Sequence, residues 1–235
     1  MTLKGGKTDM ADWLAFNGLS ADQCLRLIGP VSPVTRSADP PCNSATLWPD
    51  IALSLARALP SAAPVLSRLI TAAKVDLSPD ISRFPRAFTL ADDGRGVPFL
   101  SCPVQGRLSD RLRLAHETGH ACQYLATGCA DIPPLLRETA AFLGEILLCQ
   151  PAATPDDTQR LALNALLDRR QQRTAARHAA TLSTALQNPG SAYDYDWNYP
   201  PAATLAARIA PDHALCWQVM TTRITLVDLV THVLG

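Results

Sequence analysis

His116-Glu117-Thr118-Gly119-His120 is the stretch of this sequence with the most specific spacing. Apolar periodicity around it predicts a helix over about residues 108–127. On a helix, positions i and i+4 lie within about 40° of each other around the axis, so both imidazoles can reach one metal ion. Glu117 lies about 100° further round, close enough to hold a water molecule bound to that ion. We expect His116 and His120 to be metal ligands and Glu117 to be a general base.

A third ligand is expected on the following helix, which the periodicity predicts over about residues 134–150. A turn through Gly128 would return the chain and bring Glu138 over the two histidines. Zinc at catalytic sites takes three protein ligands and leaves the fourth position to water. We therefore predict one Zn²⁺ per chain, bound by two histidines and Glu138. Glu145, two helical turns further on, is expected to accept a hydrogen bond from a ligand imidazole, or else to pair with an arginine.

Glutamate is used sparingly in this chain. The sequence has 21 acidic residues, and only three of them are glutamates, at positions 117, 138 and 145. The longer side chain is found where a ligand or a base on a helix needs reach. Cys122 and Cys129 flank the end of the first helix and are alternative ligands. The remaining histidines lack a partner at ligand spacing and are expected to be surface or core residues: His178, His213 and His232.

The sequence predicts a mainly α fold with a small β element. Strands are expected over residues 86–91 and 97–102, joined by a turn at 92–96 that is rich in Asp and Gly. Helices are expected over residues 21–28, 50–59, 62–74, 108–127, 134–150, 155–187, 201–209 and 212–233. We divide the chain into an N-terminal helical segment, 1–84, and a core, 85–235, within one continuous domain.

Composition narrows the classes of function. Hydrophobic residues make up 47% and charged residues 18%, which is typical of a compact globular protein. The formal net charge is zero and no basic run occurs, so nucleic acid is not an expected partner. No apolar stretch is long enough to span a bilayer, and the first seven residues lack the apolar core of a secretory signal. Seven cysteines without a CxxC pair fit reduced thiols, so we expect a cytoplasmic protein.

The metal-binding stretches also resemble a known family. Arg113-Leu114-Ala115-His116-Glu117-Thr118-Gly119-His120 resembles the stretch ending in HELGH of the oligoendopeptidase F and thimet oligopeptidase family, which are zinc peptidases of the gluzincin type. Residues 138–145 resemble the family's block with a ligand glutamate and a second glutamate seven residues on. Residues 97–110 and 160–180 resemble its cleft strand and its long helix rich in Arg and Gln. The similarity covers about residues 85–215 and implies a compact zincin-like metallopeptidase core.

A second block carries the resemblance into the substrate site. Tyr193-Asp194-Tyr195-Asp196-Trp197-Asn198-Tyr199-Pro200 is similar to the family's segment of alternating tyrosines. The resemblance implies that Tyr199 and Tyr195 stabilise the oxyanion, since a phenol can donate to the developing negative charge. The alternative is that these rings only pack a loop against the core. The residues expected to bind substrate are Phe99, Leu100, Ser101 and Tyr193, the first three through backbone pairing of an extended peptide with their strand.

The predicted function is that of a zinc-dependent metalloendopeptidase acting on a peptide substrate. Two departures from the family motivate alternatives. The histidine that precedes the tyrosines is replaced by Gly190-Ser191-Ala192, which suggests a non-proteolytic binding or biosynthetic descendant. The segment before the core is short, so the cleft is expected to be open or to be closed by a second copy or a partner. Residues 114–117 also resemble the regulatory peptidases of the ImmA/IrrE type, which would imply a single protein target.

Overall fold

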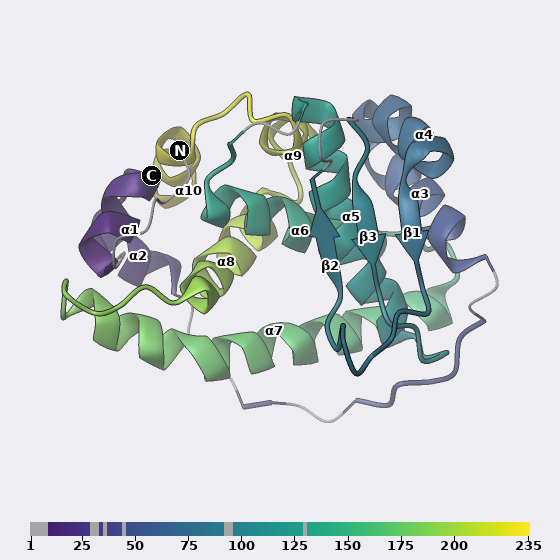
Figure 1. Cartoon of the computed structure of the whole chain (residues 1–235), viewed down its shortest axis with the longest axis horizontal. Coiled ribbons are helices and arrows are strands. Elements are labelled where there is room, and N and C mark those ends of the chain that lie inside the picture. Colours follow the sequence, from purple (N-terminus) through teal and green to yellow (C-terminus); the bar gives the residue numbers. More distant parts are fainter. Residues whose placement is uncertain (1–8, 29–32, 35–36, 44–45, 92–95, 129–130) are drawn as a thin grey trace.

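The computed structural model describes residues 9–28, 33–34, 37–43, 46–91, 96–128 and 131–235. It is mainly helical with a small three-stranded sheet, as predicted (Figure 1). The helices before the sheet are α1 (Met10–Asn17), α2 (Ala21–Leu27), α3 (Leu47–Ala58), η1 (Pro60–Ala62) and α4 (Ala63–Ala72). The strands are β1 (Lys74–Asp76), β2 (Phe88–Leu90) and β3 (Phe99–Ser101). The helices after it are α5 (Ser109–Thr127), α6 (Pro134–Leu148), α7 (Asp157–Leu186), η2 (Tyr195–Asn198), α8 (Tyr199–Ile209), α9 (His213–Met220) and α10 (Leu226–Leu234).

Helix α6 lies at the centre of the molecule. It contacts α3, α5, α8, α9 and η2, and 12 of its 15 residues are buried. Its sequence is apolar or small on nearly every side, which is the composition of a helix enclosed by other helices. The long helix α7 runs along one side of this assembly, and the sheet lies against α5 (Figure 1). The buried polar residues of α6 are therefore held in the interior.

Helices α5 and α6 approach each other very closely at two glycines. A Cβ atom added at Gly119 would lie 2.5 Å from the carbonyl oxygen of Ala140. A Cβ atom added at Gly144 would overlap the carbonyl oxygen of Ala115. Real Cβ atoms do not approach backbone atoms so closely, so neither position accepts a larger residue without moving a helix. The absence of side chains at these two positions sets the distance between the helices.

The ends of these helices follow signals that the sequence carries. Gly128 ends α5 in the left-handed conformation, with φ 69°, which glycine adopts without strain. Pro134 occupies the first turn of α6, where its missing N–H costs nothing. Asp156 caps α7, and its side chain accepts a hydrogen bond from the backbone N–H of Gln159. Gly128 and Pro134 are the residues from which the return of the chain from α5 to α6 was predicted.

The sheet has the strand order β1-β3-β2. Strands β2 and β3 pair antiparallel, with Thr89 opposite Leu100, which confirms the two predicted strands. The predicted turn between them, 92–96, lies for residues 92–95 outside the part of the chain that is described. Strand β1 pairs parallel to β3 and was not predicted, because the helical pattern was extended through residue 74. Strand β3 is therefore the central strand and not an edge.

The C-terminal helix predicted over residues 212–233 is in fact two helices. Helix α9 ends at Met220 and α10 begins at Leu226, with Thr222 between them at φ 51°. Thr225 caps α10 by accepting a hydrogen bond from the backbone N–H of Asp228. The prediction was wrong because the apolar pattern continues across the break, while the Thr-rich cap signal within it was overlooked.

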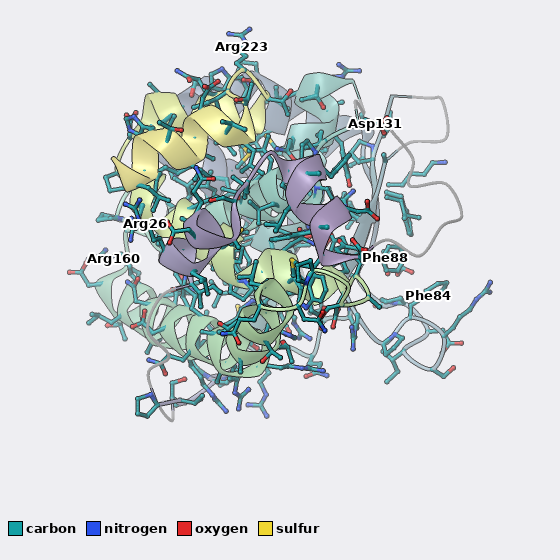
Figure 2. All side chains as sticks on the ribbon, turned by 90° about the vertical axis from the view of Figure 1, so that its left-hand side faces the viewer. Arg26, Phe84, Phe88, Asp131, Arg160 and Arg223 are labelled. Atoms are coloured by element: carbon teal, nitrogen blue, oxygen red, sulfur yellow. The ribbon has the colours of Figure 1, made fainter. Side chains whose placement is uncertain are left out.

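Helix α1 was also missed. It begins with a capping box between Asp9 and Asp12, and it buries Met10 and Trp13. The indole Nε1 of Trp13 donates to the side-chain oxygen of Asn198, 3.0 Å away. Helices α1, α2 and α10 gather at one end of the molecule, which faces the viewer in Figure 2.

The N-terminal helices pack directly on the two central helices. Helix α3 contacts both α5 and α6, and α4 contacts α5. Buried side chains from α1 through α10 form one hydrophobic cluster. None of the described helices combines the length and the apolar character needed to cross a membrane.

The close contact of α5 and α6 gives the first prediction. Gly144→Ala is expected to lower the free energy of unfolding by about 2 kcal/mol, because overpacking costs up to about 3 kcal/mol and the new Cβ would overlap a carbonyl oxygen. The better helix propensity of alanine returns only about 1 kcal/mol. Urea unfolding measures the difference. Gly190→Ala is the control, since the nearest atom to its new Cβ is 3.8 Å away. Unchanged or increased stability of Gly144→Ala would contradict the contact.

Candidate metal centre

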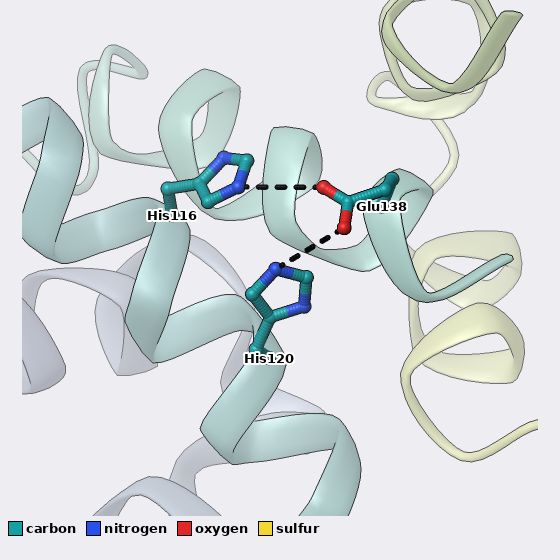
Figure 3. A group of neighbouring side chains, drawn as sticks. All are labelled: His116, His120 and Glu138. Atoms are coloured by element: carbon teal, nitrogen blue, oxygen red, sulfur yellow. Dashed lines mark ion pairs between the residues drawn. The ribbon is translucent and has the colours of Figure 1, made fainter. Parts of the chain in front are cut away.

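Three side chains from α5 and α6 point at one another (Figure 3). Nε2 of His116 lies 3.5 Å from Oε2 of Glu138, and Nε2 of His120 lies 3.7 Å from Oε1 of the same carboxylate. One ligand atom from each of the three residues lies within 4.8 Å of the others. All three side chains are buried. The structure thus brings together the three residues that the sequence analysis chose as ligands.

The spacing and the chemistry of this group suit a tetrahedral metal ion. Two ligands about 2.05 Å from a zinc ion lie roughly 3.3 Å apart in a tetrahedron. The two nitrogen–oxygen distances are close to this value. Oε2 of Glu138 is buried and has no hydrogen-bond partner among the described residues. A buried carboxylate oxygen without a donor is costly unless a cation satisfies it, so the residues fit a bound metal ion.

Glu145 orients the first histidine. Its Oε1 lies 2.6 Å from Nδ1 of His116, so Nε2 is left as the atom that faces Glu138. The guanidinium of Arg170, from α7, lies 2.9 Å from the other carboxylate oxygen, Oε2. Glu145 is thus both the imidazole partner and the arginine partner that the sequence left as alternatives. Such a carboxylate behind a ligand histidine fixes the ring and raises its basicity.

Tyr195 holds the third ligand. Its hydroxyl donates to Oε1 of Glu138 over 2.5 Å, and it accepts a hydrogen bond of 2.8 Å from Arg137. The hydroxyl is therefore engaged with the carboxylate of the candidate metal ligand Glu138. Burial and the nearby Glu138 carboxylate raise the pKa of Tyr195, so the phenol stays protonated and remains a donor.

Burial and charge act together on the titration of the three ligands. Burial tends to lower the pKa of His116, but the carboxylates of Glu138 and Glu145 outweigh it and raise this pKa to about 10. Burial lowers the pKa of His120 to about 4. Burial also tends to raise the pKa of Glu138, but His120, His116 and Tyr195 lower it to about 2. The ionised Glu138 is thus balanced by the proton on His116. A metal ion that displaces this proton can supply the positive charge instead.

Glu117 lies beside the candidate ligands and is on α5, the helix that also carries His116 and His120. Thr89, on β2, donates to its Oε2 over 2.7 Å, while Oε1 has no hydrogen-bond partner among the residues described. Burial raises the pKa of Glu117, although His116 and Thr89 oppose this change. A carboxylate with one oxygen fixed, one oxygen free and a raised pKa has the properties of a general base.

A cavity of about 640 Å³ opens onto the centre. It reaches His116 and Glu117 at one side and is bounded by Tyr199 and His178. The ring of Tyr199 packs against Phe142, His178 and Tyr195, while none of the described residues hydrogen-bonds its hydroxyl. Burial raises the pKa of Tyr199, a residue that lines the cavity, so its hydroxyl stays protonated and can donate a hydrogen bond. This volume is in the range of pockets that bind small ligands.

The residues predicted to bind substrate lie elsewhere. None of Phe99, Leu100, Ser101 and Tyr193 lines the cavity. Leu100 and Ser101 are buried, and β3 is paired on both sides. Its backbone therefore cannot add a peptide strand, and that prediction was wrong because β1 was missed. The hydroxyl of Tyr193 is 2.9 Å from the side-chain amide of Asn198, a contact that anchors the tyrosine segment.

Several residues at the centre were not predicted. Thr89 and Arg170 come from distant parts of the chain, and no sequence spacing links them to the histidines. Arg137 is the one residue of this set that sequence position could have indicated, because it is adjacent to Glu138. His178 was set aside as a surface or core residue, yet it lines the cavity beside Tyr199. Asp196 lies 3.5 Å from Nδ1 of this histidine, whose pKa burial lowers.

The cysteine alternative finds no support in the geometry. Cys122 is buried outside the group of ligand atoms, and burial raises the pKa of its thiol to about 12. A thiol must lose its proton to bind a metal, so this one is a poor ligand. Cys129 lies outside the described residues.

Comparison of the chain with protein-family models, with curated proteins and with solved structures gave no match. The assignment of the candidate metal centre therefore rests on the contacts described above. The likeness to zinc peptidases remains a prediction from the residues quoted above.

The geometry predicts how metal binding depends on Glu138. Glu138→Gln is expected to weaken zinc binding at least about 100-fold, because even outer partners of ligands contribute about 10–100-fold. Dialysis into zinc-buffered solutions followed by elemental analysis measures the occupancy. Asp22→Asn is the matched control, since it removes one exposed carboxylate far along the chain. Equal occupancy of the two variants would remove Glu138 from the ligand set.

Proposed function

We propose that this chain is a zinc-dependent metalloendopeptidase with a zincin-like core. The observation that supports this most is the position of Glu117, which stands next to a buried His116-His120-Glu138 group and opens onto a cavity. A structural zinc site normally fills all four positions with protein ligands, whereas this group offers three. Three protein ligands with a carboxylate base beside them are what a hydrolytic zinc centre needs.

The candidate metal ligands, Glu117 and Thr89 have different roles in the proposed hydrolysis. Zinc held by His116, His120 and Glu138 would supply a Lewis acid for the scissile carbonyl and would lower the pKa of a water molecule. Glu117 takes the proton of this water and passes it to the leaving amine, a role for which its free Oε1 is available. Thr89 fixes the other oxygen, so the base keeps one orientation during both transfers.

The two candidate tyrosines serve different roles in this proposal. Tyr199 has a hydroxyl that is free to donate to the oxyanion of the tetrahedral intermediate. Tyr195 already donates to Glu138, so it is a positioning residue for the third ligand. The imidazole of His178 lies beside Tyr199 and helps to fix its ring.

The peptide is expected to run along β2 and not along β3. Strand β2 is an edge strand of the described sheet, so its outer side can pair with an extended chain. Thr89 of this strand contacts Glu117. A peptide paired with β2 would therefore pass close to the general base.

Substitution of the base tests the proposed reaction. Glu117→Gln is expected to keep zinc and to lower the hydrolysis of short peptides by about 10²–10⁴-fold, because proton transfer is lost while the ligands remain. Pools of short peptides are incubated with the protein, and the products are identified by mass spectrometry. Metal content is measured on the same samples.

Three outcomes of this experiment differ clearly. Peptides that are cut by the wild type and not by Glu117→Gln support the proposal. Full activity in the variant would contradict the assignment of the base. Peptides that bind to the zinc-loaded wild type without being cut would overturn hydrolysis and favour the non-proteolytic alternative.

The division between the tyrosines gives a further prediction. Tyr199→Phe is expected to lower kcat by about 10²–10³-fold with zinc affinity unchanged, because one oxyanion donor is lost. Tyr195→Phe is expected to weaken zinc binding by about 10-fold or more, because it removes a partner of a ligand. The two variants differ from wild type by one hydroxyl each and serve as each other's control. Identical effects would contradict the division.

A further inference from the structure

One face of α7 carries a row of arginines into the cavity. Arg169, Arg173 and Arg177 are spaced at i, i+4 and i+8, which places them on one side of the helix. All three line the cavity that reaches His116, and so does Arg86 from the segment before β2. The cavity thus brings cations from two distant parts of the chain together next to the proposed catalytic centre.

The carboxylates around this cavity already have partners. Asp39 accepts hydrogen bonds from the backbone N–H and the hydroxyl of Ser109, at the start of α5. Asp110 pairs with Arg113 and accepts from two backbone N–H groups. Glu145 binds Arg170, and Glu117 binds Thr89. None of these acids neutralises the row of arginines on α7.

Three arginines are left without an acidic partner. Within the described residues, no carboxylate lies at ion-pair distance from Arg86, Arg173 or Arg177. Elsewhere on the same helix, Arg160 pairs with Asp157 in the ordinary i, i+3 manner. The whole chain has no net charge. Positive charge is therefore concentrated at this cavity, and a cleft lined by one sign of charge attracts ligands of the opposite sign.

We propose that the cavity binds the acidic side chains of a peptide substrate, with Arg86, Arg173 and Arg177 as their partners. This assignment of the substrate class rests on the proposed peptidase function. Guanidinium groups bind carboxylates through paired hydrogen bonds, so they favour Glu and Asp over neutral residues of the same shape. The same cavity contains Glu117 and His116, so one bound peptide reaches both the arginines and the reacting centre.

The dimensions favour a short acidic peptide over a nucleic acid. The unpaired arginines line one cavity of about 640 Å³, a size typical of pockets for small ligands. Nucleic-acid sites instead extend positive charge along a groove that follows several phosphates. Arg223, by contrast, lies far from this cavity, at the end of the molecule opposite α7 in Figure 2.

The experiment measures binding directly by fluorescence anisotropy on the zinc-loaded Glu117→Gln protein, in which hydrolysis is expected to be too slow to remove the peptide during the measurement. Two labelled peptides with amidated C-termini are compared, one with several Glu residues and one with Gln in their place. The Glu peptide is expected to bind about tenfold more tightly at low salt, and this preference should fall at high ionic strength. Arg173→Gln with Arg177→Gln should remove most of the preference. Arg223→Gln should keep it.

The arginines to be replaced are exposed and outside the metal centre, so the double variant is expected to fold. Equal binding of the two peptides, or an unchanged preference in the double variant, would overturn the proposal. Binding that requires a free C-terminus and is equal for the Glu and Gln peptides would overturn the proposal, because the arginines would then bind the terminal carboxylate. Tighter binding of a phosphoserine peptide or of a single-stranded oligonucleotide would also overturn the assignment to acidic side chains.

The outcomes for binding and for hydrolysis are independent. A Glu preference in binding, with no peptide cut by the wild type, would retain the acidic ligand and reject the peptidase. Cleavage of peptides without any preference for Glu would support the peptidase and reject the acidic ligand.

Discussion

The close contact between α5 and α6 is the constraint on which the rest of the structure depends. Gly119 and Gly144 let the two backbones approach until a single methyl group would overlap a carbonyl oxygen. The histidines and Glu138 lie on these two helices, so the distance between the helices sets the distance between the ligands. The geometry of this candidate metal centre therefore depends first on the packing of two helices.

Each residue of the centre is then held by a different element. Arg170 of α7 holds Glu145, which in turn orients His116. Tyr195 of η2 holds Glu138, and Thr89 of β2 holds Glu117. The sheet, the long helix and the tyrosine segment are therefore all required to fix side chains that two helices supply. Such outer contacts give a site its precision, because they restrict the rotamers of the groups that bind or react.

The sequence predicted those features that depend on spacing within a helix. The positions of His116 and His120 fix their relation to each other, and Gly128 with Pro134 predicts the return of the chain that brings Glu138 into place. Contacts between distant segments leave no such pattern. Thr89, Arg170 and the pairing of β1 with β3 depend on tertiary packing, so they could not be predicted. The contact of the Tyr195 hydroxyl with the Glu138 carboxylate could not be predicted for the same reason, since only the fold reveals it.

The central position of α6 has a consequence for the life of the protein. Glu138 lies on a buried helix that packs against α3, α5, α8, α9 and η2, so the ligand group is formed only when this part of the chain is folded. A ligand that binds only the folded state stabilises it in proportion to the logarithm of its concentration. A metal ion bound to this group, as proposed, would therefore stabilise the folded chain as well as serve the proposed reaction. The abundance of the protein would then follow the supply of the metal, because chains without it would be degraded first.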